Sequence, residues 1–196
     1  MSRLAATLLS LAALGAGCSP PPQVVRPESL RPTVPGATAL VVVYSRTGYT
    51  AEVARAFAQV LGADFLRLQG RGDEGGSWFS TPSWTSRVPV TPARIDLRPY
   101  RLVLIGGPIW YWRPNALTTS FIDAADLRGR DVVLFHTNEG GAMSARTVAA
   151  WQAIVAARGG RVRDVVGINR KQLPAGVSLA EAAARLAQAR RAAWER

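Results

Sequence analysis

Cysteine and histidine are almost absent from this chain of 196 residues, which contains one of each, Cys18 and His136. A single cysteine cannot form an intramolecular disulfide or a cysteine-based metal cluster, and it excludes thioredoxin chemistry, which needs two thiols. Lysine is nearly missing too. Lys171 is the only lysine, so arginine supplies the rest of the positive charge.

Two common nucleotide-binding motifs are missing as well. The first apolar run is followed neither by the G-x-x-x-x-G-K-[ST] loop of a nucleoside triphosphate site nor by the G-x-G-x-x-G turn of a dinucleotide site. Residues 44–46 and 106–108, which follow apolar runs, contain no aspartate. A phosphorelay receiver needs a cluster of aspartates at such strand ends, so that class is excluded.

Acidic residues are scarce, because 24 Lys and Arg face 13 Asp and Glu, for a net charge of +11. The excess is compatible with biased coding toward arginine, or with a basic face that meets anionic lipid or an acidic partner. No helix-turn-helix or arginine-aromatic pattern accompanies the charge, so we expect no nucleic-acid binding. From residue 158 to the end, nine cations face three acids, a bias that would suit a membrane surface.

The N-terminus has the order of segments that is typical of an export signal. Arg3 precedes an apolar run over 4–13, and small residues lead up to Cys18. The run is too short to cross a bilayer as a helix, which takes about 20 residues. We therefore expect residues 1–17 to be a signal peptide.

The residues before Cys18 resemble the lipobox of bacterial lipoproteins, although Gly15 stands where that family usually has a large aliphatic residue. The resemblance implies that Cys18 is lipidated and becomes the mature N-terminus, with plain secretion as the alternative. We expect a lipid-anchored protein of the bacterial cell envelope that faces outside the cytoplasm. Residues 18–37 are proline-rich and are predicted to be an extended tether, with one domain over 38–196.

The domain alternates short, β-branched apolar runs with amphipathic segments. This alternation predicts an α/β doubly wound sheet, because parallel strands need crossovers and right-handed crossovers place helices on both faces. Capping residues support the helix starts, with Ser144 before one helix and a capping box from Ser178 to Glu181 before the last. The predicted strands are 39–44, 65–68, 102–106, 132–135 and 162–166, and the predicted helices begin at Thr50, at Asn115 and after the caps Ser144 and Ser178.

One stretch, 69–99, breaks the alternation. It is rich in Gly, Ser, Pro and Trp and has no helical stripe where a crossover helix would stand. Long irregular segments in compact domains are often functional, so 69–99 is a candidate lid. Its aromatic residues Trp78, Phe79 and Trp84 are alternatively a patch on the sheet.

The loop after the first strand, Ser45-Arg46-Thr47-Gly48-Tyr49-Thr50, stands at the start of a helix. The N–H groups of a helix start and the positive end of its dipole bind anions, and glycine lets the main chain approach the ligand closely. The hydroxyls of Ser45, Thr47 and Thr50 can add hydrogen bonds. These features predict a phosphate site, with a well-capped helix start as the alternative.

Three segments in this order resemble the flavodoxin family. Residues 44–50 are similar to its FMN-phosphate loop, 99–112 to its third strand and the aromatic loop beside the flavin, and 135–141 to the loop after its fourth strand. The resemblance implies a five-stranded parallel sheet in the order 2-1-3-4-5 with FMN as cofactor. It implies cofactor contacts from Ser45, Arg46, Thr47, Gly48, Tyr49, Thr50, Pro108, Ile109, Trp110, Tyr111, Trp112, Thr137, Asn138, Glu139, Gly140 and Gly141.

Within this set, Trp110 and Trp112 are the candidates for stacking on the flavin. In an extended loop after the third strand, we expect one of them to face the ring while the other packs inward. Glu139 either tunes the redox potential or is an ordinary solvated charge. His136 stands at a strand end, where a structural role is the alternative to catalysis. We expect no metal site and no catalytic nucleophile.

The resemblance implies an FMN-dependent redox protein that either transfers electrons or reduces quinone-like acceptors, with an unknown redox partner. The alternative is a lipoprotein that kept the fold, lost FMN and serves as a binding or structural module. Two departures from the family concern charge: Arg101 occupies a commonly acidic position, and Arg113 follows the aromatic loop. They weaken the comparison with an acidic soluble carrier and favour a negatively charged partner or substrate.

Overall fold

The computed structural model of the chain describes residues 34–70 and 85–196. The predicted signal peptide, the lipidation site Cys18, most of the predicted tether and the aromatic residues Trp78, Phe79 and Trp84 lie outside the described residues. None of the described helices combines the length and the apolar character that crossing a membrane requires.

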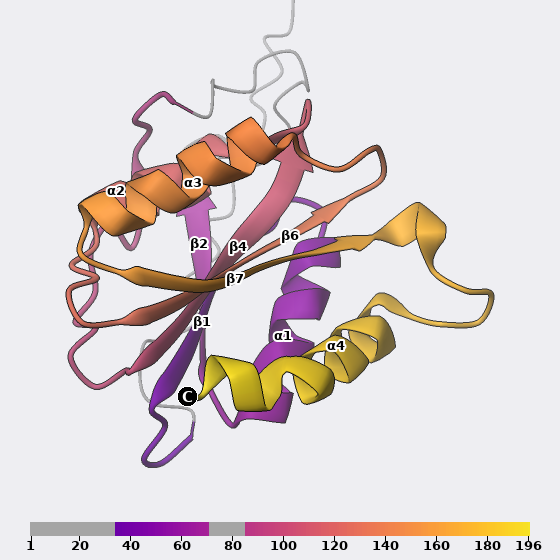
Figure 1. The fold of residues 1–196 in the computed structure, drawn as a ribbon, viewed down its shortest axis with the longest axis horizontal. Coiled ribbons are helices and arrows are strands. Elements are labelled where there is room, and N and C mark those ends of the chain that lie inside the picture. The colour runs from indigo at the N-terminus through magenta and orange to yellow at the C-terminus, as the bar shows by residue number, and fades with distance from the viewer. Residues whose placement is uncertain (1–33, 71–84) are drawn as a thin grey trace, which may run out of the picture.

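The described chain forms a sheet with two helices on each face (Figure 1). The strands are β1 (Ala39–Tyr44), β2 (Asp64–Gly70), β3 (Val90–Thr91), β4 (Leu102–Trp110), β5 (Arg113–Pro114), β6 (Asp131–Asn138) and β7 (Arg161–Asn169). The helices are α1 (Tyr49–Leu61), α2 (Ala116–Ala124), α3 (Ala145–Ala157), the short 3-10 helix η2 (Arg170–Gln172) and α4 (Leu179–Trp194).

The strand order is β3-β2-β1-β4-β6-β7, and β5 pairs with the end of β4. Strands β2, β1, β4, β6 and β7 are parallel to one another, which confirms the predicted fold class and the order 2-1-3-4-5. The two-residue strands β3 and β5 are antiparallel additions that we did not predict.

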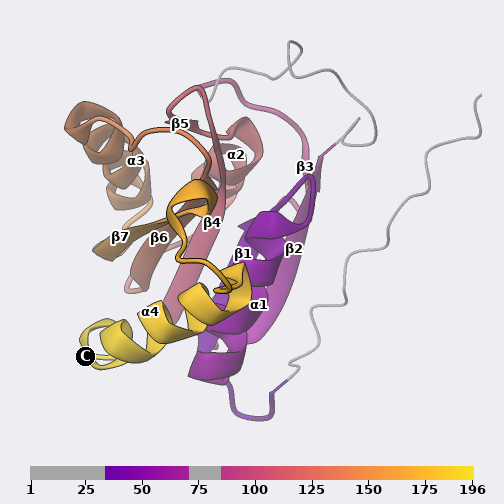
Figure 2. The same ribbon diagram turned by 90° about the vertical axis from the view of Figure 1, so that its right-hand side faces the viewer.

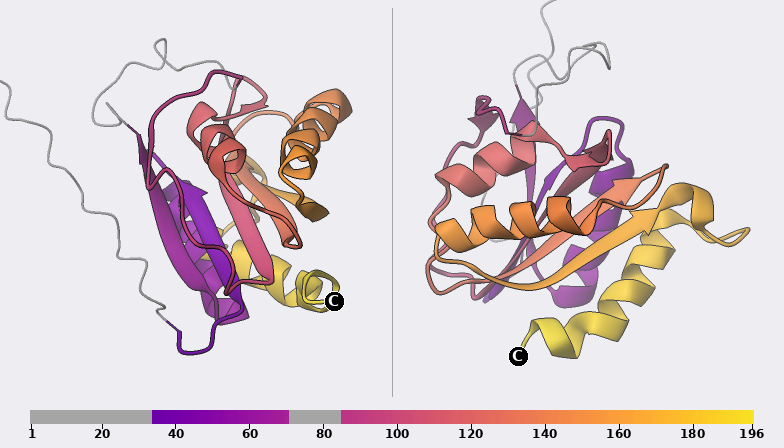
Figure 3. Two further views of the ribbon diagram at one scale, coloured as in Figure 1. Left: turned by 90° about the vertical axis from the view of Figure 1, so that its left-hand side faces the viewer. Right: turned by 45° about the horizontal axis from the view of Figure 1, so that its top comes forward.

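The central strands are buried on both faces, as their continuous apolar runs require. In β1, Val41 and Val43 pack toward α1 and α4, whereas Leu40 and Val42 pack toward α2 and α3. Figures 2 and 3 show the two helix pairs on opposite sides of the twisted sheet. The two faces therefore form separate hydrophobic clusters divided by the sheet.

The helix starts follow their capping residues closely. The side chain of Ser144 accepts a hydrogen bond from the Thr147 amide, and that of Ser178 accepts one from the Glu181 amide, so both predicted caps are confirmed. Two predicted starts are shifted by one residue: α1 begins at Tyr49 rather than Thr50, and Asn115 is the cap of α2 rather than its first residue.

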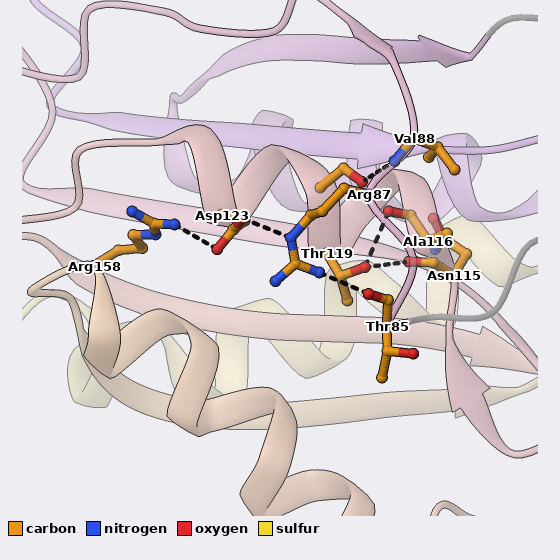
Figure 4. Close-up of polar contacts among 9 residues, drawn as sticks. Thr85, Arg87, Val88, Asn115, Ala116, Thr119, Asp123 and Arg158 are labelled. Atoms are coloured by element: carbon orange, nitrogen blue, oxygen red, sulfur yellow. Dashed lines mark hydrogen bonds and ion pairs between the residues drawn. The ribbon is translucent and has the colours of Figure 1, made fainter.

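No helix connects β2 to β4 within the described residues 85–101, as the sequence pattern predicted. This segment is instead tied to α2 by polar contacts (Figure 4). Arg87 and Arg158 both pair with Asp123, at 2.6 and 2.5 Å, and their hydrogen bonds lower the pKa of that carboxyl. The amide of Val88 donates to the hydroxyl of Ser120 at 3.0 Å. The described part of 69–99 thus contains a segment anchored on α2.

The N-terminus of α2 approaches β4 closely because β4 contains glycine. A Cβ atom at Gly107 would stand 2.2 Å from Nδ2 of Asn115 and 2.6 Å from the hydroxyl oxygen of Thr118. Asn115 cannot easily move away, since its Oδ1 caps the helix through the Thr118 amide at 2.9 Å and its Nδ2 donates to the Pro108 carbonyl. Gly107 therefore sets the distance between the helix and the strand.

We predict that Gly107→Ala lowers the free energy of unfolding by about 1 to 3 kcal/mol, the usual cost of overpacking. Urea denaturation measures it. The matched control is Gly140→Ala, where a Cβ would meet its nearest neighbour at 3.9 Å and the stability should change little. Equal stability of the two variants would contradict the close approach.

Candidate functional site

A cavity of about 480 Å³ opens at the carboxyl ends of β1, β4 and β6. The chain leaves β1 for α1 on one face of the sheet and leaves β4 for α2 on the other, so the two connections diverge and open a crevice between these strands. The lining residues are Arg46, Thr47, Tyr49, Thr50, Pro108, Ile109, Trp110, Tyr111, Thr137, Asn138, Glu139, Gly140, Arg170 and Leu179.

The first wall of the cavity is the start of α1. Gly48 is its N-cap residue with φ 95°, and no side chain caps this helix end. The hydroxyl of Ser45 accepts a hydrogen bond from the Gly48 amide at 3.2 Å, which closes the turn. The N–H groups of the first turn thus have no side-chain cap. The residues Thr47 and Thr50 line the cavity beside them.

Ser45 and Gly48 shape this turn but do not line the cavity. The side chain of Ser45 is occupied within the turn, and its carbonyl accepts a hydrogen bond from Arg67 of β2 at 2.8 Å. Thr50 lines the cavity and also contacts the end of β6, because its hydroxyl shares a hydrogen bond of 2.7 Å with that of Thr137. This buried contact joins α1 to β6 across the floor of the cavity.

The second wall is a hairpin, not the extended loop that we expected. β4 continues to Trp110 and pairs with β5, and the two residues between the strands, Tyr111 and Trp112, have φ of 50° and 59°. Two positive φ values in a two-residue turn are typical of a type I′ hairpin, whose usual residues are Asn and Gly. Because the backbone turns here, alternation along the chain does not decide which aromatic ring faces inward.

Trp110 lines the cavity and packs edge-on against Tyr44, with ring centroids 5.8 Å apart and an interplanar angle of 85°. Tyr111 lines the cavity as well but is 63% exposed. Trp112 lies outside it, 59% exposed, and lines a smaller neighbouring hollow of about 160 Å³ together with Gly141.

The third wall begins inside β6, because Thr137 and Asn138 belong to that strand rather than to the following loop. The loop is held from β7, where the side-chain amide of Asn169 donates to the Gly140 carbonyl at 2.7 Å. Oδ1 of Asn138 is buried and has no hydrogen-bond partner among the described residues. A buried acceptor of this kind costs free energy unless a donor reaches it.

Two lining residues, Arg170 and Leu179, were not predicted. The guanidinium of Arg170 forms an ion pair with Glu139 and lies 4.2 Å from the centroid of the Tyr49 ring. Arg170 therefore links η2 to two walls of the cavity. The rule that ligands bind beyond the carboxyl ends of strands could have identified it, since it directly follows β7.

His136 lies outside this cavity. Neighbouring residues of β6 alternate between faces, so His136 points to the side opposite Thr137, where its ring covers Gly167 of β7. Burial lowers its pKa from 6.5 to about 4, which keeps the ring neutral near pH 7. Among the described residues, no group of three or more His, Cys, Asp or Glu side chains could hold a metal ion.

The buried His136 makes stability depend on pH. Its pKa is lower in the folded than in the unfolded chain, so protonation favours unfolding. We predict that the free energy of unfolding falls by about 3 kcal/mol as the pH drops from 6.5 to 4, and that His136→Phe removes this part of the slope. Denaturation at several pH values measures it. Parallel curves for the two proteins would contradict the assignment.

No protein-family profile matches the sequence, and no curated protein matches it either. Solved structures do resemble the fold. A candidate flavoprotein from Bacteroides uniformis aligns with a TM-score of 0.65 and 21% identity over 78% of this chain and 99% of its own. A candidate flavoprotein from Bacteroides eggerthii gives 0.60 and 18% over 78% and 97%.

A flavoprotein from Lactobacillus acidophilus, solved in complex with FMN, aligns with a TM-score of 0.52 and 19% identity over 67% of this chain and 93% of its own. At these identities the comparison concerns the fold alone. The strand order, the position of the cavity and these neighbours agree, and the chain has a flavodoxin-like fold.

Proposed function

We propose that this chain binds FMN in the cavity between β1 and β4 and acts as a redox protein. One observation carries the proposal. Three segments far apart in the sequence, 46–50, 108–111 and 137–140, meet at a single cavity, where the connections after β1 and β4 leave on opposite faces of the sheet. The solved flavoprotein from Lactobacillus acidophilus with FMN bound supports it through the shared fold.

The residues present fit the parts of FMN. The volume of about 480 Å³ lies within the usual range of cofactor sites, about 300 to 1,000 Å³. The uncapped start of α1, with Thr47 and Thr50, suits a phosphate. Trp110 and Tyr111 offer aromatic surface to a flat ring.

FMN, when bound, supplies the electron or hydride transfer itself. The chain's own residues bind, orient and shield it. Thr50 and Thr137 hold two walls together through their hydrogen bond, and the Arg170–Glu139 ion pair adds a second contact, between η2 and the loop after β6. The surrounding arginines stabilise negative charge in the site, both that of the phosphate and that of the reduced ring.

The test is a titration of the purified protein with FMN, followed by quenching of flavin fluorescence. We expect Gly48→Ala to weaken FMN binding at least about tenfold, because alanine at φ 95° distorts the turn that presents the first N–H groups of α1 to the phosphate. Gly62→Ala is the matched control. It sits at the other end of α1, also has positive φ and an open Cβ position, and should cost similar backbone strain while leaving FMN affinity unchanged.

Thr50→Val provides a second variant, since it keeps the side-chain shape and removes the hydroxyl near the phosphate loop. Weaker FMN binding with a retained circular dichroism spectrum supports the proposal. No quenching by the unmodified protein at micromolar FMN would favour the alternative, a binding or structural module that has lost the cofactor.

We also propose that the domain is held at the bacterial cell envelope, outside the cytoplasm, by a lipid on Cys18, with residues 18–37 as the tether. The support is the sequence of the leader. We predict that metabolic labelling with a fatty-acid analogue marks the protein and that Cys18→Ser abolishes the label and releases the protein from the membrane fraction. Ala16→Gly serves as a control, because it alters the leader but keeps a small residue and the cysteine. Labelling that persists in Cys18→Ser would contradict the anchor.

A further inference from the structure

Exposed aromatic side chains gather at the mouth of the cavity. Among the residues that the structure describes, three large hydrophobic side chains are exposed, Tyr49, Tyr111 and Trp112, and all of them stand at this edge of the sheet. Tyr49 and Tyr111 line the cavity, but Trp112 does not. Its ring instead reaches the next loop, where Nε1 lies 3.3 Å from the position of a Cβ at Gly141.

The fold does not require an aromatic residue at position 112. Trp112 and Tyr111 hold positive φ angles that Asn and Gly adopt at lower cost. Exposure adds no hydrophobic stabilisation to offset this cost. Strain kept at an exposed turn points to a role in contact with another molecule.

The charge around the mouth is strongly positive. The segments 46–49, 111–113, 138–146 and 170–171 contain five cations and one carboxylate, Glu139. Arg113 and Arg146 are exposed, and the side chain of neither forms a hydrogen bond or ion pair with another described residue. Lys171 is exposed too and stands 3.9 Å from the carboxylate of Glu139, which Arg170 already occupies.

At the opposite edge of the sheet, where the strands begin, arginines form ion pairs with carboxylates. There Asp96 pairs with Arg98, Asp126 with Arg128, and Asp131 with both Arg161 and Arg163. Carboxylates compensate these cations locally. The charge at the mouth is therefore a local excess and not only the average composition of the chain.

We propose that Trp112, Arg113, Arg146 and Lys171, the mouth surface, dock a partner protein with an acidic face. The redox role of that partner rests on the proposed function, whereas the docking does not. Trp and Arg are the residue types that carry most binding energy at protein interfaces, and complementary charge speeds association and orients the partner over the opening.

A membrane surface could also attract aromatic and basic side chains, but the course of the chain favours a protein. The amide of Val34 donates to Asp64 at 3.1 Å, and Tyr100 donates to the same carboxylate at 2.7 Å. This contact fixes the first described residues at the edge away from the arrowheads of β2 and β4 (Figure 1). The described chain therefore begins at the edge of the domain opposite the mouth surface.

The test measures binding of the full chain to an immobilised plant-type ferredoxin chosen for its acidic surface, with and without FMN. We expect binding at about 0.01 M salt that weakens at least about tenfold at 0.15 M, as the Debye length falls from about 30 to 8 Å. Arg113→Glu and Arg146→Glu should each weaken binding about three- to tenfold, and Trp112→Ala by a similar factor.

Arg94→Glu is the matched control, because Arg94 is exposed on the segment between β3 and β4, outside the mouth surface, and its reversal should change binding less than twofold. Equal losses for Arg94→Glu and Arg113→Glu would overturn the proposal, as would equally tight binding of a basic cytochrome c. So would binding to phosphatidylserine vesicles through these residues without binding to ferredoxin. Because docking is measured without FMN as well, its failure is distinct from a failure to bind the cofactor.

Discussion

The position of β1 between β2 and β4 is the constraint on which the rest of the structure depends. β1 is buried along its whole length, so the chain can leave it only at its ends, and α1 must turn back over one face of the sheet. β4 continues into the hairpin and then into α2 on the other face. The two departures in opposite directions leave a crevice at the carboxyl ends of the strands, and the cavity is that crevice.

Close contacts between the helices and the strands fix the walls of the crevice in place. Gly107 lets the start of α2 lie directly on β4, and the hydrogen bond between Thr50 and Thr137 ties α1 to β6 beneath the cavity. Arg170 then joins the last strand to the first helix and to the loop after β6. Structural contacts thus form the base and sides, while the uncapped first turn of α1 and the rings of Trp110 and Tyr111 line the space that a ligand would occupy.

The sequence predicted those parts of the fold that depend on local patterns. Apolar runs identified all five parallel strands, and Ser144 and Ser178 marked two helix starts correctly because their hydroxyls cap the nearest turns. The β4–β5 hairpin was not predicted, because Tyr111 and Trp112 are not turn residues and only the structure shows their positive φ. Arg170 was missed for a different reason: the apolar pattern ended the last strand at Val166, whereas β7 continues to Asn169 and brings Arg170 to the cavity.

A crystal structure of this chain grown with FMN tests the central claim most directly. The account predicts the phosphate against the first turn of α1, near Thr47 and Thr50, and the flavin ring between the hairpin and residues 137–140. FMN bound anywhere else on the fold, or a well-ordered cavity that excludes FMN at saturating concentration, would contradict it.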